Sequence, residues 1–426
     1  MTANCETSNS TDITNSNCKN NGCIKHKDMG PGRICSCACP GYGKVCPCTT
    51  ILAERDAAQA TTSLYKDSQT LFHPQPPLFH VYRRDQLLIG KQLGAGGFCQ
   101  VHEVTVKDEP NFVGTTGETP KYAIKFLKKI TMVDKKLYVQ GAADLAVEAN
   151  FLAALSARNP ERKHVVRLHG IADGLIEHSE HTHGMERTLF LIMDKLSETL
   201  EHRIQQWKGE DKSTSGIGNA MTRTGIEFQE KRFEKLRGEQ LLVGLQVAEA
   251  MQYLHSVNLI YRDLKPENVG FDESGTVKLY DFGLSKELKE SQKYEDGNYK
   301  MTGGAGSVRY MAPEVVLCRP YNASVDVYSF GILLCELASL TKAFRGFDVN
   351  DHMDRVVEGG QRPRVEYWFP DALQTLLKVC WAQDATERPS FDEVVESLKT
   401  VIEAEPEQQE ASVLKTLSDL SFEIFR

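Results

Sequence analysis

Short apolar runs separated by polar turns predict that the chain is rich in strands from residue 87 to residue 194. LLIGKQLGAGGFCQVHEV, at 87–104, consists of two apolar runs around a glycine cluster. Further strands are predicted at 122–127 (YAIKFL), 164–172 (HVVRLHGIA) and 187–194 (RTLFLIMD), and a helix at 143–157 (ADLAVEANFLAALSA). An exposed loop is expected at 107–120.

From residue 241 the apolar period changes from that of strands to that of helices. Five apolar residues recur three or four positions apart: Leu241, Leu245, Ala248, Met251 and Leu254. Two short alternating runs, NVGFD and TVKLYD, then flank a turn at residues 273–275, and more helices follow from 313 on. The two halves together predict an α+β fold with a β-rich part followed by a larger helical part.

The ends of the chain have a different composition. Residues 1–84 are predicted to be a cysteine-rich, disordered tail, because large apolar residues are few in its first fifty positions. Eight of the 12 cysteines lie there, so metal binding, lipidation and redox activity remain alternatives. Residues 405–426 are expected to be an acidic tail with a short amphipathic helix, which docks on its own domain or on a regulatory partner. A flexible insert is predicted at about 208–236.

Composition and charge exclude several classes of function. The formal net charge is −8 and no long basic block is present, which argues against a nucleic-acid or membrane-surface partner. The longest strongly apolar run, at 330–340, contains Glu336 and is too short for a transmembrane helix. No secretory signal is visible, so a reducing intracellular location is expected, in the cytoplasm or the nucleus.

The first candidate site lies in the β-rich part. The glycines at 94, 96 and 97 predict a hairpin whose backbone can approach a phosphate closely, although a plain tight hairpin would need the same residues. Lys125 lies in the middle of a strand, where an inward-facing lysine needs a partner. Glu148, on the predicted helix, is the expected partner; a lysine on an edge strand that reaches the surface is the alternative.

The second candidate site is YRDLKPENV, at 261–269, followed by DFG at 281–283. Carboxylate and amide oxygens are the ligands that Mg²⁺ prefers, together with phosphate oxygens of a substrate. We therefore expect Asn268 and Asp281 to hold metal, and Asp263 to accept the proton of a substrate hydroxyl. Lys265 would neutralise charge on a transferring phosphoryl group.

In this order, the motifs resemble those of the eukaryotic protein kinases over about residues 85–404. LGAGGFCQV resembles the glycine-rich loop, AIK the strand-lysine motif, YRDLKPEN the catalytic loop and APE (312–314) the end of the activation segment. The resemblance implies a two-lobed fold, with a small β-rich N-lobe (85–193) that holds one key helix and a helical C-lobe (194–404).

The resemblance also implies the roles of single residues. It implies that ATP and Mg²⁺ are the cofactors, that Asp263, Lys265, Lys125 and Glu148 are catalytic, and that Asn268 and Asp281 bind metal. The residues implied to bind the nucleotide are Gly94, Ala95, Gly96, Gly97, Val101, Ala123, Lys125, the gatekeeper Met193, and the backbone of Asp194 and Leu196. Asp326 resembles the aspartate that binds the catalytic-loop backbone, and Arg388 the arginine that pairs with Glu314.

Two residues depart from the motifs of the family, and the motifs also predict which acceptor residues are phosphorylated. Cys99 replaces the third loop glycine, as a space-filling or a reactive residue, and Tyr261 replaces a histidine. DLKPEN is typical of serine/threonine kinases and the flanking motifs resemble the tyrosine-kinase-like group, so we expect Ser/Thr acceptors in protein substrates. Thr302 is the expected regulatory phosphosite, with Arg262 as its partner, and Ser307 is expected to be structural. The alternative is a catalytically weak pseudokinase that acts as a scaffold.

Overall fold

The computed structural model describes residues 80–107, 122–128, 135–158, 163–172, 189–214 and 236–403. They divide into two compact units. We call the described residues up to Thr199, with Gly270–Ser285, the sheet unit, and Leu200–Val269, with the described residues from Lys286 on, the helical unit. The cysteine-rich tail, most of the predicted 107–120 loop and the predicted C-terminal amphipathic helix lie outside the described residues.

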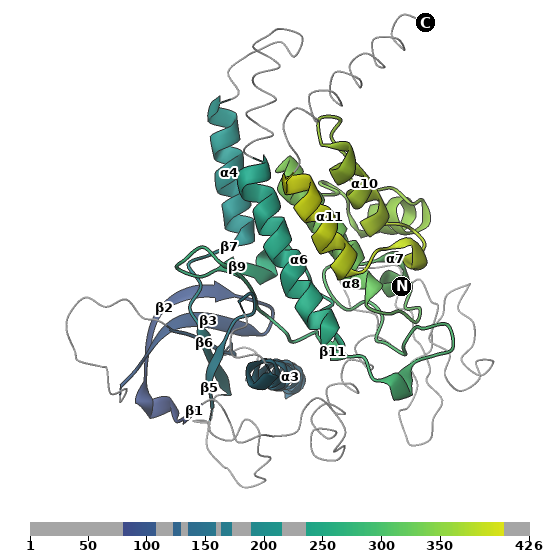
Figure 1. The fold of residues 1–426 in the computed structure, drawn as a ribbon. Coiled ribbons are helices and arrows are strands. Elements are labelled where there is room, and N and C mark those ends of the chain that lie inside the picture. Colours follow the sequence, from purple (N-terminus) through teal and green to yellow (C-terminus); the bar gives the residue numbers. More distant parts are fainter. Residues whose placement is uncertain are drawn as a thin grey trace, which may run out of the picture. The chain divides into compact units, whose positions relative to one another are not determined.

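The sheet unit is built on a six-stranded sheet (Figure 1). Its strands, in spatial order, are β1 (His80–Tyr82), β5 (Leu168–Ala172), β6 (Phe190–Asp194), β4 (Tyr122–Leu127), β3 (Cys99–Val106) and β2 (Leu87–Ala95). All neighbouring strands are antiparallel except β1 and β5. The strands predicted from 87 to 194 are confirmed, but β1 precedes the predicted domain start at 85, because its pairing partner is remote in sequence. The short helix η2 (Arg84–Gln86) joins β1 to β2.

Alternate side chains of the strands form the core of the sheet unit. Ile124 and Phe190 are almost completely buried, as is Val104 on the neighbouring strand. Burying an aliphatic or aromatic side chain of this size contributes about 1.5–3 kcal/mol. The same alternation places Lys125, one position after Ile124, on the opposite face of β4.

Helix α3 (Lys135–Arg158) packs on β4, β5 and β6. It begins eight residues before the predicted start at 143, because packing on the sheet outweighs the low helix propensity of Gly141. Leu145, Leu152 and Leu155 are buried at helical spacing, and Glu148 lies on the same face. This face therefore presents a carboxylate to the sheet.

A second, three-stranded sheet contains β7 (Glu198–Thr199), β9 (Val269–Phe271) and β10 (Val277–Leu279). The predicted turn at 273–275 joins β9 to β10 and contains Gly275 at φ 80°, a conformation that favours glycine. Asp272 Oδ1 accepts hydrogen bonds from the N–H groups of Ser274 and Thr276. β10 ends two residues before Asp281, so the DFG turn follows directly from a strand.

The helical unit contains the remaining elements. Its long helices are α4 (Leu200–Thr214), α6 (Leu241–Ser256), α8 (Ser324–Ser339), α10 (Asp371–Cys380) and α11 (Phe391–Glu403). The short helices are η3 (Leu236–Gln240), η4 (Pro266–Asn268), η5 (Glu290–Gln292), η6 (Val308–Tyr310), α7 (Pro313–Val316), α9 (Val349–Asp351), η7 (His352–Glu358) and η8 (Ala385–Glu387). β8 (Leu259–Ile260) and β11 (Lys286–Glu287) form a two-stranded sheet.

Helix α6 packs against α8 and α11 in the middle of the helical unit, and α10 packs against α8 (Figure 1). All residues of α8 from Val325 to Ala338 are buried, which explains the apolar run at 330–340 as a core helix. Glu336 within it accepts hydrogen bonds from Tyr310 Oη (2.9 Å) and from the N–H of Ala343 (2.6 Å). Among the described residues, no helix is long and apolar enough to cross a membrane.

Helix α4 extends to Thr214, into the stretch for which the sequence predicts a flexible insert. The other difference concerns the boundary between the two parts of the domain, which the sequence predicts at 193/194. The structure divides the chain after Thr199 and assigns residues 270–285 to the sheet unit, because β9 pairs with β7. The predicted α+β fold class is confirmed, with one β-rich unit that contains one long helix and one helical unit.

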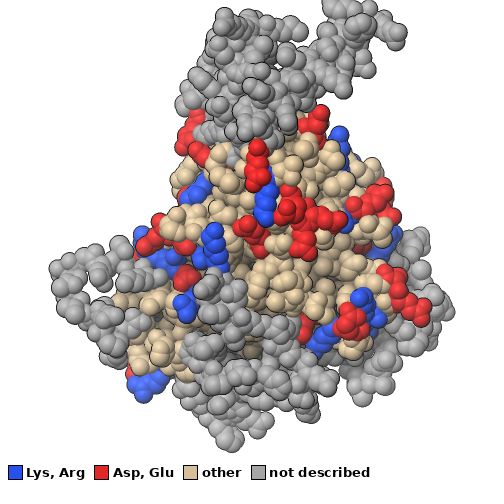
Figure 2. All heavy atoms as spheres, in the orientation of Figure 1, with Lys and Arg blue, Asp and Glu red and all other residues tan. Residues whose placement is uncertain are grey.

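Charged side chains of both signs alternate over the described surface that faces the viewer in Figure 2. Acidic residues gather in several places there, and lysines and arginines lie between them. The described part of this face thus agrees with the charge pattern of the sequence.

Candidate active site

Lys125 of β4 is the centre of an ion-pair cluster within the sheet unit. Its Nζ lies 2.7 Å from Glu148 Oε2 of α3 and 2.9 Å from Asp281 Oδ1 of the DFG turn. The Glu148 side chain is 1% exposed, that of Lys125 is 13% exposed and that of Asp281 is 44% exposed. The pairing of Lys125 with Glu148 that the sequence predicts is therefore present, and the surface alternative is wrong.

Burial by itself would lower the pKa of Lys125, but the Asp281 and Glu148 carboxylates outweigh it and raise the pKa. The ammonium group is therefore charged at neutral pH. The two carboxylates therefore hold this largely buried cation in one position.

A third carboxylate, Asp144, lies on the same face of α3, one turn before Glu148. Burial, followed by the negative charge of Asp281, raises the pKa of Asp144 to about 7. A side-chain carbon at Gly283 would lie 3.5 Å from Asp144 Cβ, so this aspartate packs beside the DFG turn. Asp144 is not among the site residues predicted from the sequence, although its i, i+4 spacing from Glu148 is visible there.

The glycine-rich hairpin is the end of β2 and the start of β3. Gly94 pairs with Val101 across the two strands, and the N–H of Gly96 donates to Cys99 O (2.9 Å). A side chain at Gly94, Gly96 or Gly97 would meet none of the described atoms within 4 Å. Packing within the described chain therefore does not explain these glycines, whereas close approach of a ligand to the backbone would.

Cys99, at the start of β3, is 8% exposed. Burial raises the pKa of its thiol to about 12, so the thiol is neutral. Reactive cysteines are thiolates in accessible, electropositive surroundings. The structure therefore supports the space-filling interpretation of Cys99.

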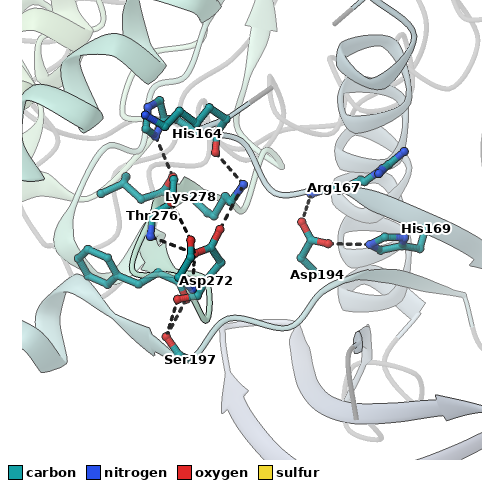
Figure 3. Close-up of polar contacts among 12 residues, drawn as sticks. His164, Arg167, His169, Asp194, Ser197, Asp272, Thr276 and Lys278 are labelled. Atoms are coloured by element: carbon teal, nitrogen blue, oxygen red, sulfur yellow. Dashed lines mark hydrogen bonds and ion pairs between the residues drawn. The ribbon is translucent and has the colours of Figure 1, made fainter. Parts of the chain in front are cut away.

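The residues predicted to meet a base follow β6. Ala123, on β4, pairs with Met193, the predicted gatekeeper, and the chain continues as Asp194, Lys195 and Leu196. We call Asp194–Ser197 the hinge. Figure 3 shows that Asp194 reaches Arg167 and His169, and that Ser197 lies against the β9–β10 turn.

Asp194 is ionised in this environment. Burial raises its pKa, but the hydrogen bond and charge of His169 and the N–H of Arg167 outweigh that effect, so the pKa is lower than normal. The N–H of Asp194 donates to Arg167 O (3.1 Å), and Arg167 N–H donates back to Asp194 Oδ2 (2.9 Å). The first residue of the hinge is thus bound to the loop before β5 through both its backbone and its side chain.

Asp263 is the centre of the other predicted site, within the helical unit. Its Oδ2 accepts hydrogen bonds from Lys265 Nζ (2.6 Å) and Asn268 Nδ2 (2.8 Å), and its Oδ1 accepts one from Ser307 Oγ (3.1 Å). Lys265 Nζ also donates to Ser307 Oγ at 2.9 Å. Since both oxygens have donors, the carboxylate is held in one orientation.

The loop that presents Asp263 is held by Asp326 of α8, which is completely buried. Asp326 accepts hydrogen bonds from the N–H groups of Tyr261 and Arg262, each at 2.8 Å, and from His255 Nε2 at 2.9 Å. Arg262 has φ 69°, a left-handed conformation that is costly for a residue with a side chain. Asp326 therefore fixes a strained loop, as the sequence resemblance implies.

The activation segment contacts the same loop. Arg262 Nη1 donates to Thr302 Oγ1 (2.8 Å) and to Tyr321 Oη (3.3 Å), and Tyr321 Oη donates to Thr302 O (2.8 Å). Thr302 is 8% exposed. The predicted contact of Thr302 with Arg262 is therefore present, with a hydroxyl rather than a phosphate as the acceptor.

Arg388 and Glu314 form the predicted ion pair at the end of that segment. Arg388 Nη1 and Nη2 donate to the two Glu314 oxygens at 2.5 and 3.0 Å, a bidentate geometry. The Arg388 side chain is fully buried and its guanidinium stacks 5.1 Å from the centre of the Tyr328 ring. The pair ties the APE motif to the loop before α11.

The structure thus assembles two constellations. Lys125, Glu148 and Asp281 meet within the sheet unit, and Asp263, Lys265, Asn268 and Ser307 meet within the helical unit. An ion-paired lysine and an oriented carboxylate of these kinds are typical of phosphoryl-transfer proteins.

Residues 87–398 match the family described as protein tyrosine and serine/threonine kinase. The chain belongs to this family, and the resemblance to protein kinases is confirmed. The match covers both constellations and most of the two described units.

Similar proteins include kinases of different specificity. Vascular endothelial growth factor receptor 2 of Mus musculus is 28% identical over 354 residues, 77% of this chain and 25% of the receptor. Dual specificity protein kinase shkB of Dictyostelium discoideum is 40% identical over 158 residues (36% and 23%). Serine/threonine-protein kinase STY17 of Arabidopsis thaliana is 37% identical over 184 residues (43% and 31%). The matched part of this chain covers between 23% and 31% of the length of these relatives.

Proposed function

We propose that the protein is a serine/threonine protein kinase that transfers the γ-phosphate of ATP to hydroxyl groups of protein substrates. The observation that carries the proposal is the orientation of the Asp263 carboxylate by Lys265, Asn268 and Ser307. A base must be held within reach of the proton it accepts, and three donors on two oxygens supply that restraint.

In this proposal Asp263 orients the substrate hydroxyl and accepts its proton. Lys265 lies 2.6 Å from Asp263 and brings a positive charge to the place where the phosphoryl group would transfer. Positioning and charge stabilisation account for most of the catalysis in phosphoryl transfer. Asp263 and Lys265 thus supply a proton acceptor and charge compensation from one short loop.

Lys125 is proposed to bind the ATP phosphates, and Glu148 to hold its side chain in place. Glu148 is 1% exposed and contacts the ammonium at 2.7 Å, so it fixes the position of Nζ without exchange with solvent. Gly94, Ala95, Gly96, Gly97 and Val101 are proposed to line the nucleotide with their backbone, and Ala123 and Met193 to flank its base.

Asn268, in the helical unit, and Asp281, in the sheet unit, are each proposed as a ligand for Mg²⁺. Asn268 Nδ2 donates to Asp263 O and Oδ2, which leaves the amide oxygen as the atom that a cation would contact. Asp281 is the most exposed carboxylate of the Lys125 cluster, at 44%. When bound, the ion would neutralise phosphate charge; hard oxygen ligands are those that Mg²⁺ prefers.

Serine and threonine are proposed as acceptors because the motif DLKPEN, which contains Lys265, resembles the catalytic loop of serine/threonine kinases. The names of the relatives include a serine/threonine-protein kinase and a dual specificity protein kinase, so specificity for tyrosine as well is the competing outcome. An intracellular place of action is also proposed: among the described residues, the buried Cys99, Cys335 and Cys380 are free thiols, as expected in a reducing compartment.

The test is transfer of radiolabelled phosphate from ATP to a basic protein mixture by the full chain. We expect incorporation by the wild type and a loss of at least about a hundredfold in Asp263→Asn and in Lys125→Met. Asp354→Asn, on the exposed surface, is the matched control and should retain activity. Equal incorporation by the wild type and the two site variants would favour the pseudokinase scaffold.

Phosphoamino-acid analysis of the labelled product separates the two specificities. Label on phosphoserine and phosphothreonine alone supports the proposed acceptor class. Label on phosphotyrosine that disappears in Asp263→Asn would instead show that the protein has dual specificity.

A further inference from the structure

The polar side chains of the hinge are all bound to other strands of the sheet unit. Asp194 contacts β5, Lys195 Nζ lies 2.8 Å from Glu103 Oε1 of β3, and Ser197 Oγ donates to Phe271 O at 2.9 Å. Under the proposed function, the backbone of Asp194 and Leu196 meets adenine. A backbone that recognises a base must be placed accurately, and these side-chain contacts are the means present to place it.

The contact to β5 depends on an irregularity in the sheet. The register of β5 against β6 shifts between Leu168 and Gly170, which pair with Met193 and Ile192. His169 is therefore the extra residue of a β-bulge. Bulges re-aim side chains, and this one brings the His169 ring to Asp194, at the end of the neighbouring strand (Figure 3).

The His169 ring is held on two sides. Its Nε2 lies 2.6 Å from Asp194 Oδ1, and the ring lies 4.6 Å from that of Tyr122, centre to centre. Tyr122 itself pairs with Asp194 across β4 and β6. The side chains of His169 and Asp194 are 25% and 29% exposed, so water screens their contact only in part.

We propose that His169 is a positioning residue for nucleotide binding: through Asp194, it fixes the hinge backbone that recognises the base. The N–H of Asp194 donates to Arg167 O, and its side chain contacts His169 Nε2. These two contacts together fix the orientation of the backbone that continues into the rest of the hinge. This role rests on the proposed function, because it concerns the base subsite of the same nucleotide.

The proposal predicts an effect on the base but not on the phosphates. Lys125, which we assign to the phosphate end, pairs with Glu148 and Asp281, whereas His169 pairs with Asp194 at the base end. Loss of the His169 contact should therefore weaken the binding of adenosine and leave the binding of inorganic tripolyphosphate unchanged. A general loss of folding would weaken both.

The experiment measures dissociation constants of adenosine and of tripolyphosphate by calorimetry on the full chain. In His169→Phe, which retains a ring against Tyr122 but lacks the donor, we expect adenosine to bind about tenfold more weakly. In His169→Gln, which places an amide donor near the position of Nε2, the loss should be under about threefold. KM for ATP should follow the adenosine constant, with kcat unchanged.

The matched control is His80→Phe, the same exchange on β1, where His80 pairs with Gly170 next to the bulge. It should leave both constants unchanged. If His169→Phe does not fold, Asp194→Asn, which retains an acceptor for Arg167 N–H, is measured in its place with the same expectation for the two ligands.

Unchanged adenosine binding in His169→Phe would overturn the proposal, as would an equal loss of tripolyphosphate binding or a failure of glutamine to rescue. These results are independent of catalysis. A wild type that binds both ligands but transfers no phosphate would contradict only the proposed function.

Discussion

Asp326 of α8 accepts a hydrogen bond from the backbone N–H of Arg262 at 2.8 Å, across 64 positions of sequence. The contact connects the core of the helical unit to the loop that carries Asp263. Since Arg262 is in a left-handed conformation, the loop needs an external restraint, and a buried carboxylate with three donors supplies it.

Asp326→Asn should therefore destabilise the protein. The amide can replace only one of the two carboxylate acceptors, and its NH₂ group would face a backbone donor. We expect a loss of about 3 kcal/mol in the free energy of unfolding, measured by urea titration. The exposed Asp354→Asn should change it by less than about 0.5 kcal/mol; similar curves for both variants would contradict the role of Asp326.

The Glu314–Arg388 pair predicts a measurable coupling energy. Glu314→Gln leaves a fully buried guanidinium without its carboxylate and should cost about 3 kcal/mol. In a double-mutant cycle with Arg388→Met, the second change should cost much less in the Glu314→Gln background than in the wild type. Additive effects of the two changes would show that the pair contributes nothing beyond its separate side chains.

His352 predicts a loss of stability in acid. Burial, together with the charges of Arg309 and Arg362, lowers the pKa of His352 from about 6.5 to about 4. Between these values the unfolded chain binds a proton that the folded chain does not, so stability falls as pH falls. His352→Phe, which retains the ring against Phe344, should lose roughly 2–3 kcal/mol less than the wild type between pH 7 and pH 4.

Parallel denaturation curves for His352→Phe and the wild type across that range would contradict the prediction. At pH 7 the phenylalanine variant should be at least as stable as the wild type, because His352 Nε2 is buried and has no hydrogen-bond partner among the described residues.

The contact between Thr302 and Arg262 predicts that phosphorylation of Thr302 affects the loop that carries Asp263. A phosphate there would exchange the neutral hydroxyl acceptor of Arg262 for a charged one, which strengthens the contact. We expect mass spectrometry to find phosphate on Thr302 after incubation with ATP and Mg²⁺, and activity to rise in the wild type but not in Arg262→Gln. An equal rise of activity in both proteins would show that the effect of phosphate on Thr302 does not depend on Arg262.

Much of the fold could be predicted because its signals are local. The alternation at 122–127 and the helical spacing from Leu241 to Leu254 depend only on nearest neighbours, and β4 and α6 are where they were expected. The motif around Asp263 could be predicted for the same reason: Asp263, Lys265 and Asn268 lie within six positions of the sequence.

Contacts between distant segments could not be predicted in this way. The parallel pairing of β1 with β5 lies outside any local pattern, and so does the bulge at His169. Asp144 is an intermediate case: its spacing from Glu148 was visible, but only burial beside Asp281 gives it a raised pKa.

The sequence by itself determined which residue types are present and which local elements carry them, since periodicity and turn residues act over a few positions. The tertiary structure decided which charges meet. Lys125 contacts Glu148, as the sequence predicts, but also Asp281, 156 positions away, and His169 contacts Asp194 beside a register shift of β5. The energy of such a contact depends on the distance between the two charges and on their burial, and both are set only when the chain has folded.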